Sequence, residues 1–121
     1  MSERQNNKPF DLEERTFQFA KNVRLYIKTL PKTIANIEDA KQLVRSSGSV
    51  GANYIEANES FSKKDFVHKA KISRKEAKES RYWLRLINET NNLENNNELV
   101  DLIQEADELK KIFSAIIEKS K

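Results

Sequence analysis

The most informative residues of this sequence are bases gathered in one segment. Between Lys63 and Arg85, nine lysines and arginines stand against three acids, which leaves a local net charge of +6. Seven of these bases recur at helical spacing, so one helix would carry them on a single face roughly 30 Å long. They are Lys64, Lys71, Arg74, Lys75, Lys78, Arg81 and Arg85. This basic ridge could neutralise several phosphates and predicts non-specific binding of nucleic acid, with RNA as the first candidate.

Other features point away from that function. A charged helix face can simply be solvated, and the ridge lacks aromatic residues for stacking bases, with Tyr82 expected only at its edge. From Glu94 to Glu108 there are six acids and no base. This acidic stretch could pair with the ridge of a neighbouring subunit, which would use the ridge in assembly instead of nucleic-acid binding.

A second group of polar residues is expected between two helices. An antiparallel hairpin that turns near residue 61 would bring Arg45 level with Glu76, and Gln42 level with Glu79. We expect a partly buried salt bridge there, with the remaining polar residues satisfying backbone or partner groups. The predicted structural cluster comprises Gln42, Arg45, Asn53, Glu56, Glu76 and Glu79. The alternative is a carboxylate metal site, because the ExxE spacing occurs at 56–59, 76–79 and 105–108.

Composition argues against an enzyme, a metal centre and a cofactor site. The chain has no Cys and one His, whereas di-iron bundles need Glu-x-x-His on two helices. Two glycines cannot build a phosphate-binding loop. His68 and a serine of 46–49 could form a nucleophile pair, but nothing supplies an oxyanion hole. We therefore expect no catalytic residue, no metal and no cofactor.

The apolar pattern predicts an all-α protein of one domain. Apolar residues recur every three to four positions in four stretches, expected as helices at 11–30, 36–59, 63–88 and 98–119. Short connections favour an antiparallel up-down-up-down four-helix bundle over 10–121, preceded by a flexible polar tail at 1–9. No stretch approaches 18 apolar residues and no secretory signal is present, so we expect a cytoplasmic protein without membrane contact.

Two details of the helices concern their packing. Glu38 and Asp39 are expected in the first turn of the second helix. Residues 46–52 are almost all small and include both glycines, which predicts unusually close helix packing because the helical period continues through them. Four large apolar residues are candidates for a subunit interface: Phe17, Leu25, Tyr82 and Trp83.

Residues 42–86 resemble a bacterial family of four-helix-bundle proteins, the 23S ribosomal RNA intervening-sequence proteins. The resemblance covers most of the chain and is most specific in this middle third. Ala57 departs from it, because the family usually has Gly at that position. The residues that carry the resemblance are Gln42, Leu43, Arg45, Ser46, Asn53, Glu56, Phe66, Glu76, Glu79, Tyr82, Trp83 and Leu84, with Phe10, Leu12, Leu30 and Pro31 before them.

The resemblance implies a homopentamer that forms a closed ring around a central channel. A related group of proteins assists the reverse transcriptase of diversity-generating retroelements and binds nucleic acid. We therefore expect a non-enzymatic ring that binds RNA or DNA through its basic ridge. The alternative is an adaptor that serves self-assembly or a protein partner such as a reverse transcriptase, with no nucleic-acid binding of its own.

Overall fold

Four helices make up the structure, a computed structural model that describes residues 11–93 and 96–121. They are α1 (Leu12–Ile27), α2 (Ile34–Asn58), α3 (Lys63–Thr90) and α4 (Asn97–Lys119). The described residues form no strand, so the all-α prediction is confirmed. The predicted tail at 1–9 lies outside them. No helix among the described residues combines the length and apolarity needed to cross a bilayer.

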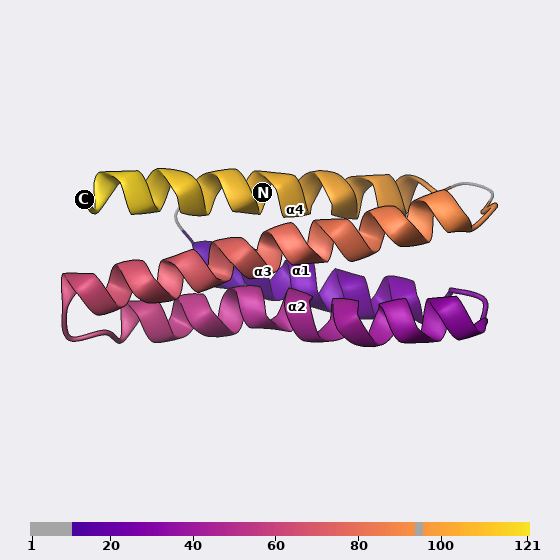
Figure 1. Cartoon of the computed structure of the whole chain (residues 1–121), viewed down its shortest axis with the longest axis horizontal. Coiled ribbons are helices and arrows are strands. Elements are labelled where there is room, and N and C mark those ends of the chain that lie inside the picture. Colours follow the sequence, from indigo (N-terminus) through magenta and orange to yellow (C-terminus); the bar gives the residue numbers. More distant parts are fainter. Residues whose placement is uncertain (1–10, 94–95) are drawn as a thin grey trace.

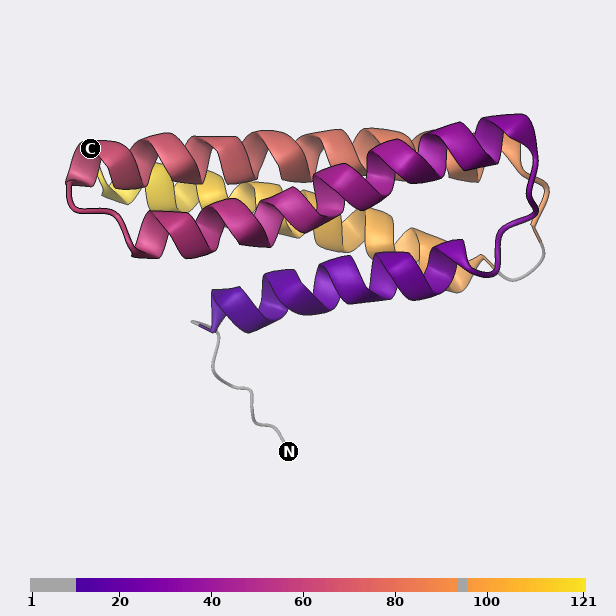
Figure 2. The ribbon, with the colours of Figure 1, turned by 90° about the horizontal axis from the view of Figure 1, so that it is seen from below.

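The helices pack side by side around one core. All four run along the same long axis, with the α1–α2 connection at one end and the α2–α3 connection at the other (Figure 1). Within the described ranges α2 contacts α1 and α3, and α4 contacts α3 and α1, whereas α1 does not contact α3. Figure 2 shows α1 lying along one side of this arrangement. The outward faces of α1 and α3 therefore lie on diagonally opposite sides.

Three observed helix ends differ by two or three residues from the predicted boundaries. Helix α2 begins at Ile34 instead of residue 36, because Thr33 Oγ1 accepts a hydrogen bond from the amide of Asn36 at 3.1 Å. Glu38 and Asp39 were expected in the first turn of this helix, but they consequently lie beyond it. Helix α1 stops at Ile27 instead of residue 30, since turn hydrogen bonds take over before Pro31. Helix α3 runs two residues past its predicted end at 88.

The apolar stripes meet in one core whose largest members come from all four helices. The fully buried large side chains are Phe19, Val23, Leu43, Val50, Leu84, Ile87, Leu99, Leu109 and Phe113. Ala57 is a buried residue of α2, so the position that departs from the family pattern continues the helix. Ile55 of α2 is 49% exposed, because it lies at the outer edge of the α1–α2 contact.

The small residues of α2 allow two different close contacts. On one side, the Ser46 and Ser80 hydroxyls lie 2.9 Å apart and Ser73 Oγ donates to the Val50 carbonyl at 2.8 Å, joining α2 to α3. On the other side, a Cβ on Gly51 would lie 2.8 Å from Thr16 Oγ1 of α1. The helix continues through 46–52, so the predicted close packing is confirmed. Both glycines therefore face α1, whereas Ser46 faces α3.

Candidate nucleic-acid interface

The outward face of α3 carries a row of bases without ion-pair partners among the described residues. They recur at spacings of seven, four, three and seven positions, which keeps them on one side of the helix. All are exposed. We call this set the basic line: Lys64, Lys71, Lys75, Lys78 and Arg85. The acid on the same side of α3 is Glu89, one turn beyond Arg85.

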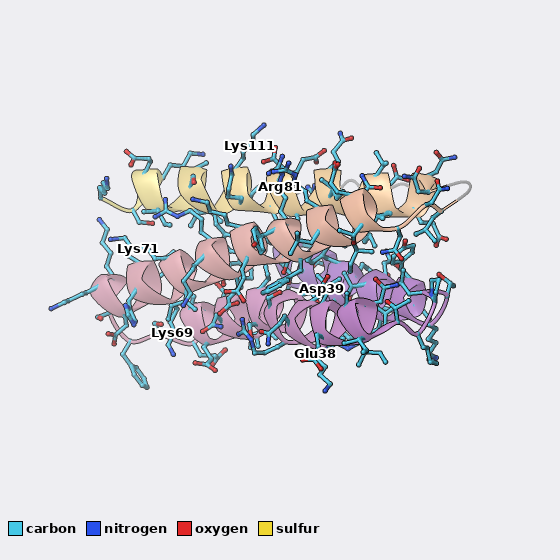
Figure 3. All side chains as sticks on the ribbon, turned by 45° about the vertical axis from the view of Figure 1, so that its right-hand side comes forward. Glu38, Asp39, Lys69, Lys71, Arg81 and Lys111 are labelled. Carbon is cyan, nitrogen blue, oxygen red and sulfur yellow. The ribbon has the colours of Figure 1, made fainter. Side chains whose placement is uncertain are left out.

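Two members of the predicted ridge lie on a different side of α3, against α4. Arg81 Nε lies 3.8 Å from an oxygen of Asp107, and Arg74 Nη1 lies 3.5 Å from Ser114 Oγ. Asp107 also pairs with Lys111 at 3.1 Å, and hydrogen bonding from Lys111 holds the pKa of Asp107 below its usual value. Figure 3 shows Arg81 on the α4 side of the helix. The ridge is therefore divided into a free line and a contact with α4.

The opposite side of α3 carries charges paired with α2. Arg45 Nη1 donates to Glu76 Oε2 at 3.4 Å, and Arg45 also forms a close ion pair with Glu79. The hydrogen bond with Glu76 raises the pKa of Arg45 above its ordinary value. Glu76 is buried, with its side chain only 7% exposed. Arg45, Glu76 and Glu79, expected near one another, are thus brought together at the α2–α3 contact.

The other members of the predicted polar cluster lie apart from Arg45. Glu56 pairs with Lys69 of α3 at 2.7 Å, on the α2 side of that helix (Figure 3). Asn53 donates to the Ser49 carbonyl at 2.9 Å within its own helix. Gln42 is exposed and forms no hydrogen bond with the described part of the chain. The predicted cluster is therefore divided. Arg45 pairs with both Glu76 and Glu79, Glu56 forms a separate salt bridge, and the amides of Asn53 and Gln42 contact neither group.

The acidic stretch is partly neutralised within the same chain by Arg15, a contact that the sequence analysis missed. Arg15 donates to Glu105 at 2.7 and 2.8 Å and to Glu108 at 2.8 Å. These contacts raise the pKa of Arg15, chiefly through the hydrogen bond with Glu105. Asp107 is also paired, whereas Glu98 and Asp101 remain exposed without an ion pair in the described ranges. The only sequence signal was the position of Arg15 beside the apolar stripe of α1.

The predicted interface residues lie on two surfaces. Phe17 and Leu25 are 61% and 49% exposed and line a groove between α1 and α2. We call it the apolar groove; its apolar walls are Phe17, Ala20, Leu25, Ala52 and Ile55, and its basic rim is Lys21, Arg24 and Lys28. Tyr82 is 57% exposed on α3, edge-on to Trp83 with ring centroids 5.1 Å apart.

The residues behind the nucleophile and metal alternatives have other surroundings in the structure. His68 is exposed, whereas Ser46 and Ser47 are buried in α2. No group of three or more possible metal ligands occurs within 11–93 and 96–121. The ExxE carboxylates at 76–79 and 105–108 instead bind Arg45 and Arg15, respectively.

The chain is similar in sequence to one protein family and in structure to a solved protein. A family model described as 23S rRNA-intervening sequence protein matches residues 8–115. No curated protein matches the chain. A crystal structure of a protein of unknown function from the S23 ribosomal protein family of Bacteroides thetaiotaomicron superposes with a TM-score of 0.76 at 28% identity. The match covers 88% of this chain and 97% of that one. The chain therefore belongs to the family of 23S rRNA-intervening sequence proteins.

Proposed function

We propose that this protein is a non-enzymatic cytoplasmic protein that binds RNA or other nucleic acid through the basic line of α3. The bundle has antiparallel up-down-up-down topology and assembles into a closed homo-oligomeric ring. Five copies per ring is the number that the family resemblance implies. The binding is electrostatic and independent of base sequence, because lysines and arginines neutralise phosphates and release their counterions.

The observation that carries the proposal is the difference between the charges of α3. Charges on its two flanks have partners on α2 and α4, as Lys69 has in Glu56 and Arg81 in Asp107. Bases of the basic line are exposed and have no such partner among the described residues. Like charges on one helix face repel each other, so the line does not stabilise the helix. A polyanion would relieve that repulsion.

The acidic stretch competes less well for the basic line than its composition suggested. Glu105 and Glu108 are held by Arg15, and Asp107 by Lys111 and its neighbours. A neighbouring subunit would have to break those contacts before these three acids could pair with α3, which leaves it Glu98 and Asp101 as exposed acids without an ion pair in the described ranges. This supports a nucleic acid as the partner of the basic line.

The surface for self-assembly lies elsewhere. Large exposed apolar residues gather on α1 and α2, and the apolar groove is formed by both helices. Exposed apolar patches of this kind are typical of subunit interfaces. Because α1 does not contact α3 within the described ranges, assembly through the groove leaves the basic line open.

The test is binding of a fluorescent structured RNA, followed by polarisation over a range of salt concentrations. Replacing Lys71, Lys75 and Lys78 by Gln should weaken binding on the order of 100-fold at low salt and reduce the salt slope by about 3. The matched control replaces Lys41, Lys111 and Lys121 by Gln, since these lysines are exposed but paired with acids of their own helix or terminus. The control removes the same charge and should keep most of the affinity. Equal losses in both variants would contradict a defined site.

The second candidate is an adaptor for a protein partner, such as a reverse transcriptase. The apolar groove favours it, because its apolar walls offer contacts for a protein helix. A ring that ignores RNA even at low salt would support this function and refute the first.

A further inference from the structure

We infer that the nucleic acid bound by the basic line is single-stranded, with one unpaired base stacked on Tyr82. The inference rests on the proposed function and names the ligand class of the same surface. Its starting observation is the position of Tyr82, which the sequence analysis expected at the edge of the ridge. The structure places Tyr82 within the row, four residues after Lys78 and three before Arg85. Residues at these spacings are neighbours on one helix face.

The Tyr82 ring is both exposed and supported. Tyr82 is 57% exposed, although the next residue, Trp83, packs against the core. Trp83 meets it edge-on, with an interplanar angle of 81°. Trp83 is itself held by a hydrogen bond from Nε1 to Glu79 Oε2 at 3.4 Å, and Glu79 is anchored by Arg45. The Tyr82 ring is therefore supported by the α2–α3 contact through Trp83 and Glu79.

The cations on either side suit the phosphates that flank a stacked base. At 1.5 Å per residue, Lys78 and Arg85 lie about 6 and 4.5 Å along the helix from Tyr82. An aromatic face within a row of cations is the arrangement that binds single strands without base preference. Bases in a duplex are already stacked on each other, so a duplex could use the cations but not the ring. The combination therefore selects unpaired nucleotides.

The alternative occupant of Tyr82 is a protein surface, either a second copy or another partner. The surroundings of the ring favour nucleic acid, because its neighbours along the outward face are Lys75, Lys78 and Arg85. Protein interfaces tend to be depleted of lysine, and here lysines flank the ring on its N-terminal side.

The experiment compares a single-stranded oligouridine with an RNA duplex of the same length. Trp83 is the only tryptophan, so its fluorescence reports events at the adjacent Tyr82. Tyr82→Leu should weaken binding of the single strand on the order of tenfold and leave duplex binding within about twofold. Tyr82→Phe should keep the wild-type preference. Phe61→Leu is the matched control, because Phe61 is a fully exposed aromatic residue in the α2–α3 turn, before the basic line begins.

Each outcome decides one of the two proposals. Wild-type binding of the single strand with a change in Trp83 emission, lost in Tyr82→Leu, supports the stacking site. Equal single-strand binding by wild type and Tyr82→Leu overturns it, while the proposed function stands if the Lys71, Lys75 and Lys78 variant loses affinity. A lower assembly mass for Tyr82→Leu would also overturn the stacking site, because the Tyr82 side chain would then belong to a subunit contact. No binding of either RNA by wild type refutes both proposals.

Discussion

The outward faces of α1 and α3 lie on opposite sides of the bundle and differ in the large side chains that they expose. Helix α1 presents Phe17 and Leu25, both about half exposed or more, beside a groove shared with α2. Helix α3 presents bases together with Tyr82. Neither set is needed to fill the core, which is already closed by the buried stripes. This difference supports the proposal of two separate tasks, self-assembly on α1 and α2 and ligand binding on α3.

On the two sides of α3 that face α2 and α4, charged side chains have partners and contribute to the packing of the bundle. Arg45 and Glu76 meet across the α2–α3 contact, and Arg81 lies against Asp107 across the α3–α4 contact. In each case a partner is present and one side chain is at least partly buried. Exposure without a partner in the described ranges thus separates the basic line from the structural charges of the same helix.

The largest effect is expected from breaking the α1 side of the comparison. Replacing both Phe17 and Leu25 by Glu places two charges beside the apolar groove and should reduce a ring to monomers in light scattering. The fold should survive, because both side chains are exposed in the chain described here. Phe61→Glu is the control, since Phe61 is also exposed but lies outside the groove. An unchanged mass for the double variant would move the interface elsewhere.

A smaller effect is expected when a structural charge of α3 loses its partner. Arg45→Met leaves the buried Glu76 carboxylate without its cation and should lower the free energy of unfolding by about 2 kcal/mol. This is below the usual cost for a fully buried pair, because the Arg45 side chain is 50% exposed. Denaturant unfolding measures the loss. At denaturant concentrations below the unfolding transition, RNA affinity should stay within about twofold of wild type. A large loss would show that the paired charges on the sides of α3 also contribute to RNA binding, and would contradict their separation from the basic line.

Sequence reasoning succeeded where the signal was periodic and local. The four helices and the level of Arg45 with Glu76 follow from spacing along the chain and from one short turn. The contact of Arg15 with Glu105 joins residues 90 positions apart, so no local pattern carries it. Tyr82 was expected at the edge of the ridge, and it lies within the basic line because Arg74 and Arg81 contact α4 instead. The split of the basic ridge depends on which side α4 covers, which only packing determines.

The smallest effects are expected from the two glycines that face α1. Gly51→Ala places a Cβ against buried Thr16, whose Oγ1 is engaged with the Glu13 carbonyl, and should destabilise by about 1 kcal/mol even after the gain in helix propensity. Gly48→Ala meets the flexible end of Arg24 at 3.1 Å and should be neutral or stabilising by up to about 1 kcal/mol. Thermal unfolding of both variants tests how tightly α2 holds α1. A reversed order would contradict this packing.

The most direct test of two separate surfaces is the assembly mass of the variant with Lys71, Lys75 and Lys78 replaced by Gln. Light scattering is measured on this variant and on wild type at the same concentration and salt. The account predicts the same ring mass for both, combined with loss of RNA binding in the variant alone. A variant that falls apart into monomers would contradict it, because the basic line would then hold subunits together instead of nucleic acid.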